Sequence, residues 1–259
     1  GSGLDCSLAY DHFKKHILDV NDHVDVFYHT WSVENEDKLK ELYKPKDCIA
    51  EEQIHFDFEY SVGPGHGGEG TYRGVENLRF HSLFSKWYSA QQVNNLKKNY
   101  EIKNNFKYDI VMLTRFDLAY IVDFKFIHCD KEKFYVIGPD GGPTGYNDLW
   151  FFSNSENMDK FCDMYDYVKD IKYFAHKHTH NHYYCKKYIN EELKLTNQVQ
   201  FVGHRAWTGS PLDPNGPEGG PSPTVRHLYR LSERVTVKED EKARKVVTAA
   251  NKKITRKEG

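Results

Sequence analysis

The residues of this 259-residue chain that could carry chemistry lie where apolar segments end. In the sequence YDIVMLTRFDLAYI, a compact apolar run over residues 110–113 changes abruptly to charge at Arg115 and Asp117. Ligands of open α/β sheets bind at the carboxyl ends of the strands, and residues two apart in an extended chain project to the same side. A carboxylate there can bind a hard divalent cation, and an arginine can clamp phosphate. We therefore expect a metal or diphosphate site at Arg115 and Asp117, with a purely structural Arg–Asp pair as the alternative.

A second carboxylate, Asp148, is the last residue of the turn-rich sequence PDGGPTGYND and directly precedes the strand predicted over residues 149–153. A carboxylate close to an acceptor hydroxyl can take its proton, so Asp148 is a candidate general base or acceptor contact. Asn147 and Asp148 at the start of a strand are also ordinary turn residues. Both interpretations of this pair stay open.

The helix predicted over residues 75–100 carries polar side chains at spacings that bring them to one face. Such groups could reach a nucleotide or a diphosphate, and a solvated helix face is the alternative. The residues are Arg79, His81, Ser82, Ser85 and Lys86. The preceding stretch over residues 61–74, SVGPGHGGEGTYRG, is half Gly and Pro but lacks the P-loop pattern. It predicts an irregular, mobile lid over a donor rather than regular structure.

A run of alternating histidines, HKHTHNH, contains His176, His178, His180 and His182. In a strand all four would point to one face and form a metal-binding patch. No carboxylate or cysteine is interleaved, and the helical sequence YYCKKYINEEL follows directly. We therefore favour a solvent-exposed loop for this run.

The elements that must position these residues alternate between helix and strand. Apolar periodicity predicts helices over residues 4–20, 38–43, 75–100 with a break near Ser89, 157–170 and within 176–195. β-branched and aromatic runs predict strands over residues 24–31, 110–113, 133–138, 149–153 and 199–203. This order favours a three-layer α/β sandwich in one domain over residues 4–207. Residues 208–259 read as a Pro/Gly-rich linker and a charged tail.

Composition excludes several classes of function. The net charge of −2 gives no electrostatic attraction to nucleic acid. Five scattered cysteines without a CxxC pair argue against a zinc site or a disulfide scaffold, so a reducing, cytoplasmic location is expected. No apolar run reaches the roughly 18 residues of a membrane span, although a removed anchor or targeting segment would leave no trace here.

An ordered set of motifs resembles a known group of proteins. The sequences DVFYHTW, NLKKNYE, KYDIVMLTRFDLAY and YNDLWFFSNSENMDKF together resemble viral, bacterial and algal glycosyltransferase-like proteins from polysaccharide gene clusters. The resemblance spans roughly residues 10–202. In those proteins the R-x-D-L strand stands where better-known GT-A enzymes carry an Asp-x-Asp metal motif.

The resemblance implies a GT-A fold with a mixed, mostly parallel sheet, a nucleotide-diphosphate-sugar donor, and Mn²⁺ or Mg²⁺. It implies that Asp117 binds metal or diphosphate, that Asp148 faces the acceptor, and that His204 is a further metal ligand. The other donor-binding residues that we expect are Arg115, His29, Trp31, Ser82, Ser85 and Lys86, with His29 and Trp31 in one crevice with Asp117. The strand that precedes the first helix in such proteins has no counterpart here, and Arg115 replaces the first Asp. Metal coordination then rests on Asp117 alone, or the arginine takes over part of the metal's electrostatic role.

The function expected from these observations is transfer of a hexose or deoxyhexose from a nucleotide donor to a glycan or glycoprotein acceptor. A catalytically inactive module of the same fold that binds glycan or protein is the first alternative. The second is an enzyme of phosphate-ester or nucleotidyl transfer that uses the same diphosphate site.

Overall fold

A computed structural model of the chain describes residues 6–56, 59–62, 70–73, 78–120, 122–139, 145–171, 173–174, 181–202 and 225–227. Within these residues it is an α/β protein with both parallel and antiparallel strand pairs, so the predicted class is confirmed. The chain divides into two compact units. The first unit contains residues 1–24, 112–152 and 199–259, and the second contains residues 25–111 and 153–198.

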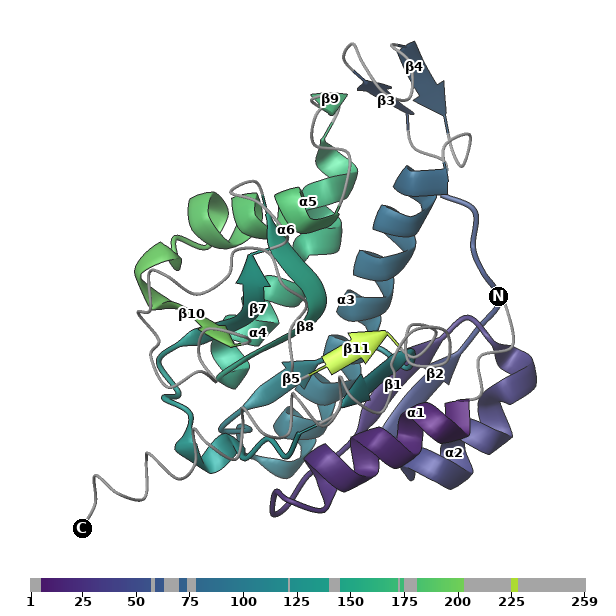
Figure 1. Ribbon diagram of the computed structural model, residues 1–259. Coiled ribbons are helices and arrows are strands. Elements are labelled where there is room, and N and C mark those ends of the chain that lie inside the picture. Colours follow the sequence, from purple (N-terminus) through teal and green to yellow (C-terminus); the bar gives the residue numbers. More distant parts are fainter. Residues whose placement is uncertain are drawn as a thin grey trace, which may run out of the picture. The chain divides into compact units, whose positions relative to one another are not determined.

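The largest sheet contains strands β5 (Val111–Leu113), β7 (Phe134–Pro139), β8 (Tyr146–Ser153) and β10 (Val199–Val202), in the order β10-β7-β8-β5 (Figure 1). Strand β10 runs parallel to β7, and β8 runs antiparallel to β7 with shifts in register. Nearly every residue of β8 is buried, in agreement with its continuous run of apolar side chains.

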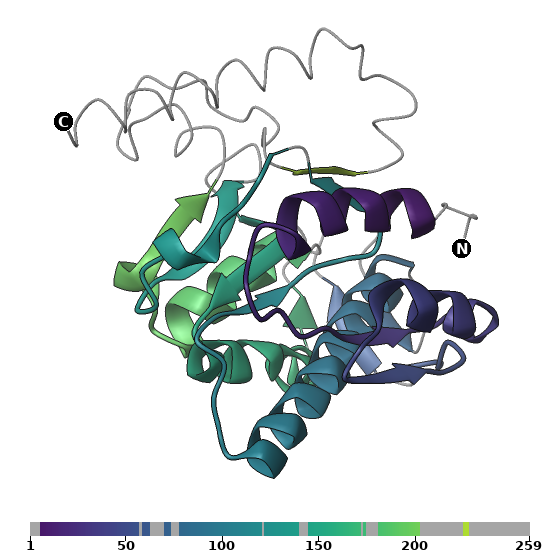
Figure 2. The same ribbon diagram turned by 90° about the horizontal axis from the view of Figure 1, so that it is seen from below.

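The first unit also contains helix α1 (Cys6–Phe13), which continues into a π-helical turn, η1 (Lys14–Leu18). Helix α1, purple in Figure 2, packs on strand β6 (Leu118–Tyr120), and β6 pairs with β11 (Val225–His227). A short 3-10 turn, η3 (Phe126–His128), follows β6. The core here is aromatic: the ring of Trp150 contacts those of Tyr120, Phe124 and Phe152. These contacts bury large apolar surfaces.

The second unit is built on two parallel strands, β1 (Phe27–Thr30) and β2 (Asp47–Ala50), with helix α3 (Leu78–Asn104) packed on both. Between the strands come η2 (Val33–Asn35) and helix α2 (Glu36–Tyr43). Helix α2 ends at Lys44, which has the left-handed backbone conformation, and Pro45 follows it. The predicted strand over residues 24–31 and helix over 38–43 are thus confirmed in position.

Helix α3 is continuous, so the predicted break near Ser89 is wrong. The Ser89 hydroxyl donates to the Ser85 carbonyl oxygen at 2.9 Å, which satisfies it within the helix. At the other end, Asn105 is left-handed, with φ of 53°. The N–H groups of Asn105 and Phe106 donate to the carbonyl oxygens of Ile102 and Glu101, and the Phe106 ring contacts Tyr100. This pattern is a Schellman motif with its hydrophobic contact.

The remaining helices of the second unit are α4 (Ser155–Cys162), α5 (Met164–Asp170), α6 (Asn181–Lys187), η5 (Tyr188–Glu192) and η6 (Thr196–Gln198). Helices α4 and α5 pack on α3, and Trp87 meets Phe161 edge to face in the core. Asn154 caps α4 by accepting a hydrogen bond from the Asn157 N–H. The single helix predicted over residues 157–170 is therefore two helices.

The stretch over residues 61–74 contains regular structure, contrary to the prediction. Strands β3 (Glu59–Val62) and β4 (Gly70–Arg73) form an antiparallel pair, and β9 (Tyr173–Phe174) runs parallel to β3. Backbone pairing requires no particular side chain, so Gly70 can take part in the ladder. Residues 63–69 and 74 lie outside the described residues, so the predicted mobility of a lid stays a prediction.

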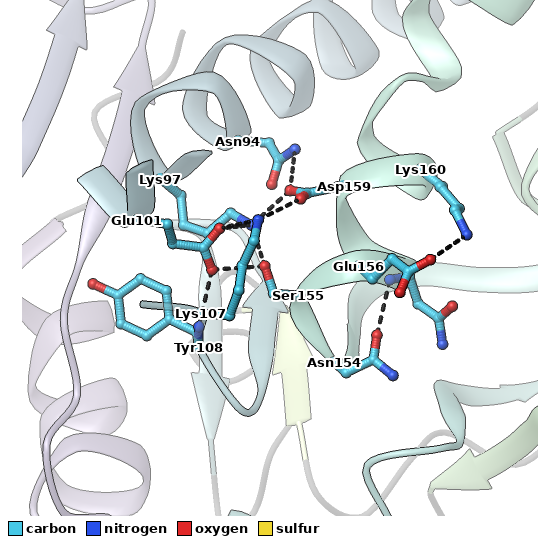
Figure 3. A network of polar contacts seen from close by, with 11 residues as sticks. Asn94, Lys97, Glu101, Lys107, Tyr108, Asn154, Ser155, Glu156, Asp159 and Lys160 are labelled. Carbon is cyan, nitrogen blue, oxygen red and sulfur yellow. Dashed lines mark hydrogen bonds and ion pairs between the residues drawn. The ribbon is translucent and has the colours of Figure 1, made fainter. Parts of the chain in front are cut away.

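A buried ionic network joins α3 to α4 (Figure 3). The side chain of Lys97 donates to Ser155 Oγ and Asp159 Oδ1, both at 2.6 Å, and to Glu101 Oε2 at 3.2 Å. Glu101 has no exposed surface and also accepts from Ser155, from Lys107 and from the Tyr108 N–H. Every charge in the network has a partner, so we interpret the network as a structural link between the two helices.

No helix within the described residues is long and apolar enough to cross a membrane. Within the described residues the strand pairs include the parallel pairs β1–β2, β10–β7 and β3–β9 and the antiparallel pairs β7–β8, β3–β4 and β11–β6. The GT-A arrangement, a mostly parallel sheet and the boundaries 4–207 and 208–259 stay predictions.

Candidate functional site

The carboxyl edge of β1 and β2 gathers polar and aromatic side chains. His29 lies in β1, Trp31 follows that strand directly, and Glu51 follows β2 directly. The Glu51 N–H donates to the Thr30 carbonyl oxygen at 3.0 Å, which continues the parallel pairing past the strand ends. Tyr88 joins them from α3. We call His29, Trp31, Glu51 and Tyr88 the edge cluster.

The four side chains of the edge cluster contact one another closely. His29 Nε2 lies 2.9 Å from Glu51 Oε1, and the His29 side chain is 1% exposed while that of Glu51 is 34% exposed. The Trp31 and Tyr88 rings stack with centroids 5.4 Å apart and planes 24° apart. The His29 ring meets Trp31 edge on at 4.6 Å. A partly exposed carboxylate therefore lies beside a half-buried pair of aromatic rings.

Burial and the Glu51 carboxylate set the protonation of this cluster. Burial lowers the pKa of His29, and the hydrogen bond to Glu51 opposes that change without reversing it. Burial also raises the pKa of Tyr88, and the nearby charge of Glu51 raises it further. A carboxylate only accepts, so Nε2 of the neutral imidazole carries the proton and Nδ1 carries a lone pair. Within the described part of the chain, this Nδ1 is buried and has no hydrogen-bond partner.

The predicted donor-binding residues of α3 differ in their relation to this edge. Gln53, two residues beyond Glu51, donates to Ser85 Oγ at 2.6 Å, which ties the segment after β2 to the helix. Ser82 is exposed on the same helix. The Lys86 ammonium lies over the Trp87 ring, 5.3 Å from its centroid. A hydrogen bond thus connects Ser85, one of the three predicted residues, to the edge segment.

Arg115 and Asp117 form an ion pair in the first unit. Arg115 Nε donates to Asp117 Oδ1 at 2.8 Å, and its terminal nitrogen Nη2 donates to Oδ2 at 2.6 Å. The two residues lie in the connection between β5 and β6, so Asp117 does follow the end of the predicted strand. A turn, rather than the expected extended backbone, brings them together. Their side chains are 38% and 24% exposed, so solvent and small ions reach the pair.

The predicted metal site has one described member. No three His, Cys, Asp or Glu side chains within the described residues lie together in a way that could hold a metal ion. His204 lies outside those residues, as do His176, His178 and His180. His182 lies in α6, in agreement with the predicted helix after the histidine run. The metal role of Asp117 and His204 stays a prediction.

Asp148 lies inside strand β8, which begins three residues earlier than the strand predicted over residues 149–153. Strand β8 begins at Tyr146, because Tyr146 and Asn147 already pair with β7. Asp148 is buried, while the Asn147 side chain accepts from the Leu149 N–H at 3.1 Å. This bond to the N–H two residues on is that of an Asx turn, so Asn147 has the turn chemistry of the alternative interpretation. The role of Asp148 toward an acceptor stays a prediction.

Glu51 and Tyr88 are the members of the edge cluster that the sequence did not single out. The position of Glu51 in the sequence could have identified it, because Glu51 directly follows strand β2 just as Trp31 directly follows strand β1. The prediction missed it because strand β2, DCIA, is short and only half-buried, so its apolar signal is weak. His29 and Trp31 belong to the second unit and Asp117 to the first, so their shared crevice stays a prediction.

Comparison with protein-family models and with curated protein sequences gives no match to this chain. The fold and the site are therefore interpreted from their own chemistry.

Proposed function

We propose that this protein is a glycosyltransferase that uses a nucleotide-diphosphate-sugar donor. The observation that carries the proposal is the edge cluster. It combines, at the carboxyl edge of two parallel strands, the groups that a nucleoside requires. The stacked Trp31 and Tyr88 offer a flat surface to a base, and the Glu51 carboxylate can accept hydrogen bonds from ribose hydroxyls.

Arg115 and Asp117 serve the diphosphate in this proposal. The arginine fork matches phosphate oxygens, and Mg²⁺ or Mn²⁺ is commonly held by one or two carboxylates together with substrate phosphates. A single carboxylate that is 24% exposed fits that requirement, if Arg115 releases it to the ion. The metal would neutralise the charge that develops on the leaving diphosphate. The acceptor would be a glycan or glycoprotein. Cys48, Cys129, Cys162 and Cys185 form no disulfide, which supports a cytoplasmic location.

Donor binding tests the edge cluster. Glu51→Gln and Trp31→Ala should each weaken binding of a nucleotide sugar, measured by calorimetry or by thermal shift with and without Mn²⁺. Ligand-linked stabilisation grows with ligand concentration relative to Kd, so even weak donors are detectable. Glu52→Gln is the matched control, because Glu52 is the next residue and is exposed. Unchanged donor affinity in both Glu51→Gln and Trp31→Ala would refute the role of this edge.

Turnover tests Asp117. Asp117→Asn should lower the rate of sugar transfer at least ~100-fold, because lost electrostatic stabilisation of a leaving group typically costs about 3 kcal/mol. If Asp117 only paired with Arg115, the variant would instead have a lower Tm and normal turnover of the folded fraction. Measuring Tm and turnover on the same variant separates the two roles, and near-wild-type turnover would sink the assignment.

One observation favours a second candidate, a binding module without turnover. Both oxygens of the Asp117 carboxylate already contact Arg115, which leaves the carboxylate less available to a metal ion. Such a module would bind a donor or glycan and release no nucleoside diphosphate. Slow release of nucleoside diphosphate from a bound donor supports the enzyme, and stable donor binding without release supports the module.

A further inference from the structure

We infer that His12 and His16 form a binding site for a transition-metal ion that prefers imidazole ligands, such as Cu²⁺, Ni²⁺ or Zn²⁺. Both histidines belong to the first unit and lie four residues apart on the continuous helical segment of α1 and η1. Side chains at this spacing are neighbours on a helix surface. Their ring centroids are 6.3 Å apart, with planes 32° apart.

The Nδ1 atoms of both histidines are already engaged. His12 Nδ1 donates to the Tyr120 carbonyl oxygen at 2.8 Å, and His16 Nδ1 donates to Asp123 Oδ1 at 2.7 Å. Carbonyl and carboxylate oxygens only accept, so each Nδ1 carries the proton of a neutral imidazole. Metal-binding histidines are usually oriented in this way, with one nitrogen donating to a carbonyl or carboxylate and the other facing the ion. Tyr120 and Asp123 therefore fix both rings in the tautomer that a metal requires.

The Nε2 atoms are the ones left for a ligand. Within the described part of the chain neither Nε2 has a hydrogen-bond partner, and neither is among the buried polar atoms that lack one. His12 is half-buried and His16 is 8% exposed. Each of the two neighbouring rings is thus held at Nδ1 by its own partner and leaves its Nε2 lone pair for a ligand.

The chemistry of the pair selects the ion. A metal–nitrogen bond of about 2.0 Å puts each ring centre about 3 Å from the ion, so two ligands at a right or tetrahedral angle have ring centres about 4.5 to 5 Å apart. The two rings, whose centroids are 6.3 Å apart, must therefore rotate toward each other when the ion binds. Since the described residues provide no group of three ligands, water would complete the coordination. Nitrogen sites generally bind Cu²⁺ more tightly than Ni²⁺ or Zn²⁺, in contrast to the hard cations proposed at Asp117.

Calorimetric titration with Cu²⁺ and Zn²⁺ tests this site. To remove any contribution of the other histidine-rich segment to metal binding, the reference protein carries His176, His178, His180 and His182 all changed to Gln. In that background His12→Gln should lower the affinity at least 10-fold or remove one bound equivalent. Asp123→Asn should weaken binding about 10- to 100-fold while leaving both ligands in place. His128→Gln, an exposed histidine elsewhere in the first unit, is the control and should bind normally.

The two variants also guard against a folding artefact. His12→Gln retains the contact between His16 and Asp123, and circular dichroism and Tm measured without metal show whether it is folded. Pulsed electron paramagnetic resonance of bound Cu²⁺ should detect two imidazole ligands in the reference protein and one or none after His12→Gln. Unchanged affinity in His12→Gln, or a single imidazole in the reference protein, would overturn the inference. Equal affinity in Asp123→Asn would reduce the pair to an adventitious surface site.

Discussion

Two Glu–Lys pairs at the same helical spacing have opposite surroundings in this protein. Glu101 pairs with Lys97 in α3 and has no exposed surface, whereas Glu156 pairs with Lys160 in α4 and its side chain is 78% exposed. Spacing and residue types match, and only the order of the two residues along the helix is reversed, so the local sequence does not show which pair is buried. Burial decides what each pair contributes, since an exposed pair is screened by water and a buried charge must be matched by partners.

Glu101→Gln should lower the free energy of unfolding by about 3 kcal/mol, because it leaves Lys97 and Lys107 with less compensation inside the network. Glu156→Gln is the matched control and should leave stability unchanged within error, because it removes an exposed pair. Urea unfolding of both variants at neutral pH measures the difference. Equal effects of the two substitutions would show that burial does not govern the network.

The same carboxylate should make stability depend on pH. Burial alone would raise the pKa of Glu101, but hydrogen bonds from Lys107, Ser155 and the Tyr108 N–H, with the charge of Lys97, lower that pKa from 4.5 to about 2. One pKa unit corresponds to about 1.4 kcal/mol, so ionised Glu101 contributes roughly 3 kcal/mol. Because the folded pKa is the lower one, this contribution is complete above about pH 4.5 and is lost as pH falls toward 2.

Urea unfolding of the wild-type protein and Glu101→Gln at pH 7, 5 and 3 checks the pH dependence. The gap between the two proteins should be the same at pH 7 and 5 and narrower at pH 3. Other titrating groups change both proteins alike and cancel in the gap. A gap that stays constant down to pH 3 contradicts the lowered pKa.

At the scale of single residues, the sequence predicted those candidates that follow strong apolar strands. Arg115, Asp117 and Trp31 do so, and His29 lies near the end of such a strand. The ion pair and the edge cluster contain these four residues. It did not predict Glu51, whose strand is short and half-buried. Buried charged residues such as Lys97 were not predicted either, because their burial depends on partners that are distant in the sequence, such as Asp159.

Helix ends carry the clearest information at the scale of elements. Helix α2 closes on Lys44, whose φ of 44° and ψ of 55° are left-handed, and its N–H donates to the Lys40 carbonyl oxygen. Glycine is the usual residue at such a position because a Cβ is disfavoured there. Pro45 made the end of this helix predictable from the sequence. The left-handed conformation of Lys44 was not predictable in the same way.

Lys44→Gly should therefore raise the free energy of unfolding by roughly 1 kcal/mol, because it removes the left-handed strain of a residue with a Cβ. Lys98→Gly, the same change inside α3, should lower it by about 1 kcal/mol through helix propensity. Thermal or urea unfolding of the two variants should thus shift in opposite directions. A destabilised Lys44→Gly protein would mean that the lysine side chain contributes more than its backbone strain costs.

Strands show where prediction from sequence fails for elements. The apolar strands β5, β7, β8 and β10 were predicted to within a few residues, because burial gives them a continuous signal. The strands β3, β4 and β9 were not predicted, because they form through backbone hydrogen bonds between segments that are distant in the sequence. Glycine and proline content indicated a loop there, although the backbone of such residues can still form a ladder.

The division of the whole chain suggests how it unfolds. The chain passes between the two units four times, after Val24, Val111, Phe152 and Gln198. Two of these points lie inside strands, between Val111 and Met112 in β5 and between Phe152 and Ser153 in β8. A third lies where η6 meets β10 directly. Flexible linkers of the kind that separate independent domains are thus absent at these three points.

We therefore predict that the two units unfold in one cooperative transition. Phe152 pairs with Tyr135 of β7 while the next residue, Ser153, is fully buried in the other unit, so neither half of β8 can unfold without disturbing the other. Native-state hydrogen exchange measures this without substitutions, because amides that open only in global unfolding report its full free energy. The slowest amides of β7 in the first unit and of α3 in the second should give the same opening free energy, equal to that from urea unfolding. Two distinct plateaus, one for each unit, would show that the strands shared along the chain do not couple them.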